Sequence, residues 1–363
     1  MFLKSKYLFS KYQRKTFSQS VVKISFNDLQ NPNIKNKLYS SIEEAYGEDG
    51  LGILIIEKVP EYLKARENLF NLTNQIVNLP EESKKNIENP ETKYAFGWSY
   101  GKEVISDKPD YLKASYYANL KQLNNNKSND KNIWPKEIPE AEKIFDTLGN
   151  MIRGVGLNLL DLIDSYIKNT YPSYDLNYRK LIENSTHNKG RMLYYFSRKH
   201  SKTLSKEEGE NWADWHNDHG SLTGLTSAMY VDEKGAEMKI KLTKTGLYIQ
   251  NRKGEDVRVT FGPDDIAYQL GECLQVHSGG ILHATPHAVK VMDDIPENYA
   301  RITFALFMQP NHDFLMSPPK ECRIEDIRTS DIYHVPKLQD RFRLGMNFGQ
   351  FNDATNDMYY KKK

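Results

Sequence analysis

The chain of 363 residues carries 50 Lys and Arg against 48 Asp and Glu, and this near-balance, without clustered lysines, gives no reason to expect a nucleic-acid partner. No apolar run approaches the ~20 residues that a membrane-spanning helix requires, so we expect no membrane partner. The only cysteines, Cys273 and Cys322, exclude a disulfide framework and a cysteine-rich metal site, which fits a reducing compartment.

The N-terminal end is basic and free of acidic residues up to Asp28. Its composition, with aromatics and serines among the lysines, is typical of a mitochondrial presequence, and we predict one over residues 1–20. The alternative is a general bias toward lysine and asparagine, because the segment holds a single arginine, Arg14. A mitochondrial location follows from the first interpretation and a cytoplasmic one from the second.

Residues 42–56 read as a helix that ends in a glycine turn and continues as an apolar strand. Further along, residues 124–132 form a polar, asparagine-rich insertion without the apolar residues needed to order it. Apolar residues then recur at helical spacing from Ile144 to Tyr166, which predicts a long helix packed on a core. Glycines at 149, 154 and 156 are expected to break or kink that helix.

Short β-rich runs alternate with Gly, Pro and Asp turns from Arg191 to Met308. This pattern predicts a double-sheet jelly roll, and with the helices before it the fold class is mixed α/β (α+β), a double-stranded β-helix core flanked by helices.

An imidazole and a carboxylate stand two positions apart at His216 and Asp218. Side chains of an extended segment alternate between its faces, so both point the same way and can bind one metal ion from a strand end. Two imidazoles and one carboxylate occupy one face of an octahedron and leave three positions open, as iron chemistry with a co-substrate and dioxygen requires. A second histidine must come from elsewhere.

His283 and His287 are the main candidates for that second imidazole. In an extended segment both face one side but stand ~13 Å apart at ~3.3 Å per residue, so only one can bind the ion. Pro286 argues against a helix that would bring them together. Residues 293–298 read as a polar turn between two strands, and this hairpin would place His287 near Arg301. We therefore predict His287.

Each of these pairs also has an ordinary explanation. A histidine followed two residues later by an aspartate usually marks a solvated turn. An arginine followed two residues later by a threonine, as at Arg301 and Thr303, is most often an exposed cross-strand pair. Only the ordered combination of both pairs with His287 favours a metal site.

In that combination the chain resembles the 2-oxoglutarate- and iron(II)-dependent oxygenases of the isopenicillin N synthase-like family, over most of its length. The family's proximal motif is similar to residues 216–225, HNDHGSLTGL. Its distal motif is similar to residues 284–289, ATPHAV, where an alanine replaces an arginine that is not a ligand. The resemblance implies that His216, Asp218 and His287 hold iron.

The family's Arg-x-Ser pair corresponds to Arg301 and Thr303. The resemblance implies that the guanidinium pairs with the distal carboxylate of 2-oxoglutarate while the threonine hydroxyl adds a hydrogen bond. Arginine suits this role because it binds carboxylates in a planar, bidentate manner. Tyr195 matches a tyrosine of the family that touches the same carboxylate, although Phe196 replaces the usual proline and a core tyrosine is the alternative.

The resemblance and the residue pattern together divide the chain, after the possible presequence, into four segments. These are an N-terminal dioxygenase module at 21–135, a helical support at 136–190, a jelly-roll oxygenase domain at 191–316 and a C-terminal extension at 317–363.

By resemblance the chain is expected to be an oxidoreductase that uses Fe(II), 2-oxoglutarate and O2. It would hydroxylate or desaturate a small molecule and release succinate and CO2. One alternative is an iron-dependent oxidase of the same fold that does not use 2-oxoglutarate. The other is a non-catalytic structural or interaction subunit of a mitochondrial assembly.

Overall fold

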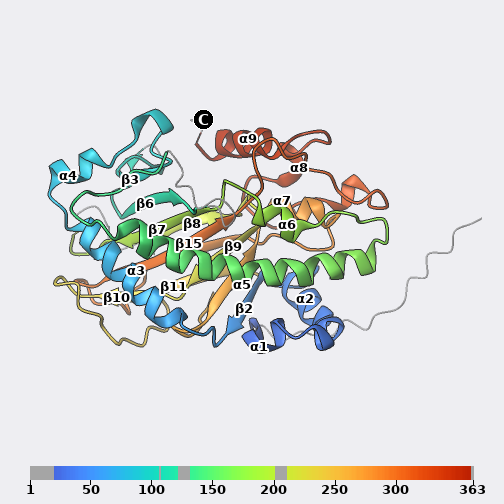
Figure 1. The fold of residues 1–363 in the computed structure, drawn as a ribbon, viewed down its shortest axis with the longest axis horizontal. Helices are drawn as coiled ribbons and strands as arrows, with labels where there is room; N and C mark the ends of the chain where they lie inside the picture. The colour runs from blue at the N-terminus through green and yellow to red at the C-terminus, as the bar shows by residue number, and fades with distance from the viewer. Residues whose placement is uncertain (1–19, 106–107, 122–130, 201–210, 361–363) are drawn as a thin grey trace, which may run out of the picture.

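The computed structural model describes residues 20–105, 108–121, 131–200 and 211–360. Within them a large and a smaller β-sheet pack together, and helices lie on the outer side of the large sheet (Figure 1). The predicted α+β class with a jelly-roll core is confirmed. Residues 1–19 of the predicted presequence and 124–130 of the predicted insertion lie outside the described residues.

The larger sheet runs in the order β1-β2-β13-β9-β15-β7-β6-β3, with β10 paired to β15. Neighbouring strands are antiparallel except β1 and β2, which are parallel. The strands are β1 (Val22–Ser25), β2 (Ile53–Glu57), β3 (Gly97–Tyr100), β6 (Lys113–Asn119), β7 (Lys189–Tyr195), β9 (Leu222–Thr226), β10 (Met229–Val231), β13 (Ile266–Leu270) and β15 (Ala300–Met308).

The smaller sheet runs in the order β12-β11-β14-β8 and is antiparallel throughout. Its strands are β8 (Asn211–His216), β11 (Gly246–Gln250), β12 (Asp256–Val259) and β14 (His287–Lys290). Side chains of the two sheets share one apolar cluster, which includes Tyr195 and Ala305 from the large sheet and Trp212 and Val289 from the small one. The sheets therefore form a sandwich with an interior between them.

The predicted helix, glycine turn and strand near the N-terminus are confirmed. Helix α2 (Tyr39–Tyr46) is capped by Gly47, and β2 follows between β1 and β13. Leu54 and Ile56 of β2 pack in the cluster beneath the helices, whereas Ile53 and Ile55 pack toward the smaller sheet. Burial on both faces explains why this strand is apolar without alternation.

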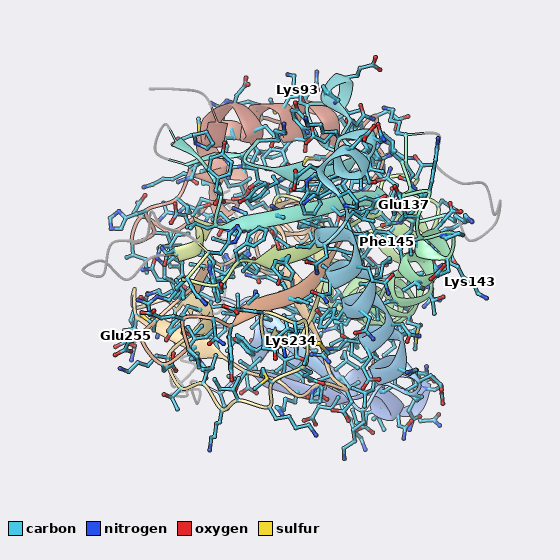
Figure 2. All side chains as sticks on the ribbon, turned by 90° about the vertical axis from the view of Figure 1, so that its left-hand side faces the viewer. Lys93, Glu137, Lys143, Phe145, Lys234 and Glu255 are labelled. Atoms are coloured by element: carbon cyan, nitrogen blue, oxygen red, sulfur yellow. The ribbon has the colours of Figure 1, made fainter. Side chains whose placement is uncertain are left out.

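Helix α5 (Ala141–Thr170) is 30 residues long and crosses the outer face of the large sheet (Figure 1). Phe145 on this helix points inward against Phe304 of β15, while Lys143 is exposed at the rim of the molecule (Figure 2). The expectation that its glycines break the helix is wrong. Gly149 and Gly156 are places of close packing, where an added Cβ would meet side chains of neighbouring elements.

Helix α3 (Tyr62–Val77) packs beside α5 against β7 and β15 of the large sheet, and other helices follow β13 in the chain. Those after β13 bury an apolar cluster with the C-terminal part of the chain. Among the described residues, no helix combines the length and apolar composition that crossing a membrane takes. The other elements are α1 (Phe26–Leu29), α4 (Glu81–Asn86), α6 (Tyr178–Glu183), α7 (Glu272–His277), α8 (Leu338–Arg341), α9 (Phe348–Tyr360), the short strands β4 (Val104–Ile105) and β5 (Lys108–Pro109), and 3-10 turns at Pro32–Leu38, Pro90–Thr92 and Ile324–Asp326.

Candidate metal centre

His216 and His287 face each other across two paired strands. His216 is the last residue of β8 and His287 the first of β14, and the two are directly opposite in the register. Their ring centroids lie 4.2 Å apart. The register thus fixes both imidazoles at one end of the smaller sheet.

Asp218 lies in the turn that leaves β8 for β9 and completes the group. Its Oδ1 is 4.0 Å from Nε2 of His216 and 3.9 Å from Nε2 of His287. All three residues offer a ligand atom within 4.8 Å of the others. Oδ2 of Asp218 is buried and has no hydrogen-bond partner among the described residues. Two imidazoles and one carboxylate, one oxygen of which lacks a hydrogen-bond partner, fit a divalent cation.

His283 lies apart from this group. Its backbone N–H donates to the carbonyl of Tyr46, which ties it to the end of helix α2. Burial, with the nearby charge of Arg252, lowers the pKa of His283 to about 3. Of the two histidines that compete in the sequence, the structure brings only His287 to His216 and Asp218.

The second nitrogen of each clustered imidazole has its own partner, and the sequence predicts neither partner. Nδ1 of His216 lies 2.6 Å from the carbonyl oxygen of Asp214. Nδ1 of His287 lies 2.6 Å from the side-chain amide of Gln269, a fully buried residue of β13. The carbonyl at Nδ1 of His216 requires the proton on that nitrogen and so leaves Nε2 for a metal, and both contacts fix the orientation of the rings.

The protonation states suit metal binding. Burial lowers the pKa of His287 to about 4, and His216 beside it acts in the same direction, so the ring is neutral near pH 7. Burial raises the pKa of Asp218, but the two histidines and a hydrogen bond with Thr223 outweigh it and leave the pKa below its usual value. Neutral imidazoles and an ionised carboxylate are the forms that bind a metal.

Arg301 and Thr303 lie on β15, on the wall of a cavity of about 510 Å³ that also reaches the three clustered residues. Nε and Nη1 of Arg301 are buried and unpartnered among the described residues. The guanidinium lies over the ring of Tyr195, 4.9 Å from its centroid. The Thr303 hydroxyl contacts Thr226. A buried guanidinium with two unused donors fits a carboxylate ligand.

The predicted hairpin between His287 and Arg301 is wrong. β14 pairs with β11 and β8 in the smaller sheet, whereas β15 pairs within the larger sheet. The connecting segment does turn, at residues 293–294 and 297–298, and the carboxylate of Asp294 ties it to another loop by accepting hydrogen bonds from the backbone N–H groups of Thr243, Lys244 and Thr245. His287 and Arg301 therefore line one cavity from two different sheets.

Arg191 and Lys113 are among the further cations that line the cavity, and sequence reasoning missed both. Glu103 receives a hydrogen bond from Arg191 at 2.5 Å and pairs with Lys113 at 3.2 Å. These cations lower the pKa of Glu103 to about 2, although burial alone would raise it. Lys113 also pairs with Asp110, so this wall is polar and rigidly held.

Residues 21–137 match the sequence pattern of a family described as "non-haem dioxygenase in morphine synthesis N-terminal". A 2-oxoglutarate-dependent dioxygenase of Gibberella zeae is 23% identical over 279 residues, which cover 74% of this chain and 68% of the relative.

Solved structures of the same fold cover nearly the whole chain. A full-length Neurospora crassa protein, solved in complex with alpha-KG, has a TM-score of 0.66 at 18% identity and covers 95% of this chain and 98% of its own. A putative 2OG-Fe(II) oxygenase family protein from Caulobacter crescentus has a TM-score of 0.67 at 18% identity, covering 93% and 98%. JOX2, in complex with 2OG, Fe and JA, has a TM-score of 0.63 at 18% identity, covering 93% and 85%.

Proposed function

We propose that this chain is an active 2-oxoglutarate- and iron(II)-dependent dioxygenase that oxidises a small molecule with release of succinate and CO2. The observation that carries the proposal is the pairing of two sites in one cavity. At one end His216, Asp218 and His287 converge, and at another Arg301 offers unpartnered donors.

In this proposal His216, Asp218 and His287 hold Fe(II), and Arg301 with Thr303 binds the distal carboxylate of 2-oxoglutarate. Bound iron and 2-oxoglutarate supply the reduction of O2, with the co-substrate oxidised to succinate and CO2 as the substrate is oxidised. Asp218 offsets one positive charge of the metal. The ring of Tyr195 supports the Arg301 guanidinium from beneath, a cation–π contact that keeps it aimed into the cavity.

A small substrate is consistent with the cavity, whose volume lies at the lower end of the ~300–1,000 Å³ common for ligand pockets. The Neurospora crassa neighbour was solved with thymine and with 5-formyluracil, and JOX2 with JA. The apolar walls from Leu193, Ala305 and Phe307 would exclude water, while Arg191 and Lys113 provide polar contacts.

Two finer assignments belong to the same proposal. The ordered motifs favour the isopenicillin N synthase-like group, and the basic, acid-free residues 1–20 favour a mitochondrial location. The oxidase alternative is less favoured because the relative from Gibberella zeae is a 2-oxoglutarate-dependent dioxygenase. The non-catalytic alternative is less favoured because the whole His-Asp-His group is assembled.

The test is an anaerobic titration of the purified protein with Fe(II) and then 2-oxoglutarate, followed by the visible charge-transfer band of the chelate. Arg301→Ala is expected to weaken 2-oxoglutarate binding by ~2–5 kcal/mol, at least roughly 30-fold, because it leaves the distal carboxylate unpaired. Fe(II) affinity should stay unchanged.

Arg258→Ala is the matched control, since this arginine also lines the cavity but donates to the backbone carbonyl of Thr245. Its 2-oxoglutarate affinity should equal that of the wild type. Iron binding without the band in the wild type would favour the oxidase alternative, and no iron binding would favour the non-catalytic one.

A further inference from the structure

We propose that Arg341, in the C-terminal part of the chain, is a positioning residue of the metal centre and acts through Glu272 on the turn that carries Asp218. The inference deepens the proposed function, on which it rests for the identity of the metal. It makes the C-terminal extension part of the iron site and not merely a cover over it.

Glu272 and Arg341 form a fully buried ion pair. Nη2 of Arg341 lies 2.6 Å and 2.8 Å from the two carboxylate oxygens of Glu272, and both side chains have no exposed area. Arg341 is itself held at three further points, by the Thr355 hydroxyl and by the carbonyls of Pro336 and Lys337. The guanidinium therefore has one position, fixed by α8 and α9.

Glu272 transmits this position to the metal-binding turn. Its Oε1 accepts a hydrogen bond of 3.1 Å from the side-chain amide of Asn217, the residue between His216 and Asp218. Its backbone N–H donates to the carbonyl oxygen of Asp218 at 2.8 Å. One residue at the start of α7 thus holds the turn by both its main chain and its side chain.

The chain permits this contact because Gly271 precedes Glu272. A Cβ at Gly271 would stand 2.2 Å from the carbonyl oxygen of Gly220 and 3.1 Å from that of Asp218. Only glycine lets the two backbones approach so closely. A second link from the C-terminal part reaches the same turn, where Nε2 of His219 lies 2.8 Å from Oδ1 of Asn352.

A buried ion pair is a weak device for stability, because apolar residues of similar volume often serve as well or better. It is a strong device for position, because a charge-assisted contact at 2.6 Å has little freedom. Outer contacts that orient metal ligands commonly change metal affinity by ~10- to 100-fold when removed. The Glu272–Arg341 pair is an outer contact of this kind, because Glu272 binds the main chain of Asp218 and the side chain of Asn217.

The experiment measures Fe(II) affinity anaerobically, by competition with a chromogenic chelator, for the full-length wild type, Arg341→Met, Glu272→Gln and the double variant. The double variant removes both buried charges together and is the one expected to fold without an uncompensated charge. Far-UV circular dichroism and thermal unfolding report the folded fraction of each protein. Arg323→Met, which removes an exposed ion pair with Asp326 in the same C-terminal extension, is the control.

We expect the double variant to be folded and to bind Fe(II) ~10- to 100-fold more weakly, with Arg323→Met unchanged. Each single variant that folds should show a loss similar to the double, because both residues act through one link and their effects are not additive. A folded double variant with wild-type Fe(II) affinity, or additive losses from the two single changes, would overturn the inference. Failure of the wild type itself to bind Fe(II) would overturn the proposed function instead.

Discussion

His283 and His287 are four positions apart, yet their surroundings give them different chemistry. His287 stands opposite His216 in a strand pair, and its ring is positioned from behind by Gln269. His283 is held by its main chain to Tyr46 and belongs to no cluster of metal-binding side chains within the described residues. We therefore expect substitution of the two histidines to separate metal binding from general packing.

His287→Ala is expected to lose Fe(II) affinity by more than the ~10- to 100-fold that follows from removing an outer hydrogen-bond partner, because it deletes one of the three proposed ligands. His283→Ala should keep Fe(II) affinity near that of the wild type. Anaerobic metal titration of both variants measures the difference. A loss confined to His283→Ala would show that the wrong histidine is assigned.

Part of the candidate site can be predicted from the sequence residue by residue. The spacing of His216 and Asp218 predicts that the two side chains lie close together, since alternation along an extended chain is local. The roles of Gln269 and Arg341 could not be predicted from spacing, because each residue reaches the site from a distant segment of the chain. The position of Arg191 on the cavity wall likewise could not be predicted from the sequence.

For secondary-structure elements, too, local patterns in the sequence predict the element but not its long-range contacts. The period of apolar residues predicts helix α5, but three glycines within it suggest a break that does not occur. The helix survives because tertiary packing outweighs the helix propensity of single residues. Likewise the polar turn after β14 is present, but β14 and β15 belong to different sheets, and no local pattern in the sequence reveals which sheet a strand joins.

The glycines of α5 provide a matched pair for testing this explanation. A Cβ at Gly154 would meet nothing within 4 Å, whereas one at Gly156 would lie 2.5 Å from Sδ of Met308 and 3.0 Å from Tyr268. Gly154→Ala should raise the free energy of unfolding by ~0.5–1 kcal/mol through helix propensity. Gly156→Ala should lower it, because overpacking costs ~1–3 kcal/mol and exceeds that gain.

Urea denaturation of the two variants and the wild type measures these changes. Equal stabilisation by both substitutions would mean that Gly156 is not needed for the approach of α5 to the sheet.

For the whole molecule, the pH dependence of stability follows from histidines that are buried in the neutral form. Burial lowers the pKa of His277 to about 4, while its imidazole contacts the carbonyl of Ser317. An unfolded histidine titrates near 6.5, so between pH 6.5 and 4 the unfolded chain binds a proton that the folded chain does not. Stability therefore falls on acidification, with a contribution from His277 on the order of 3 kcal/mol.

His277→Gln should make the free energy of unfolding less dependent on pH between 4.5 and 7. Urea midpoints of variant and wild type, measured with a chelator present so that metal binding does not contribute, provide the comparison. The comparison is needed because Asp164 acts in the opposite direction, as burial raises its pKa to about 6. Parallel pH profiles for both proteins would show that His277 titrates normally.

Strand β2 pairs in the large sheet with a strand that the ribosome makes much later. This strand is made early, but its antiparallel partner β13 begins at Ile266, about 200 residues after β2 ends at Glu57. At ~5–20 residues per second the ribosome needs roughly 10–40 s to make that stretch. During this interval the four consecutive apolar residues 53–56 lack their pairing partner β13. Translation speed and the binding of a chaperone to this short segment are therefore expected to govern the yield of folded protein.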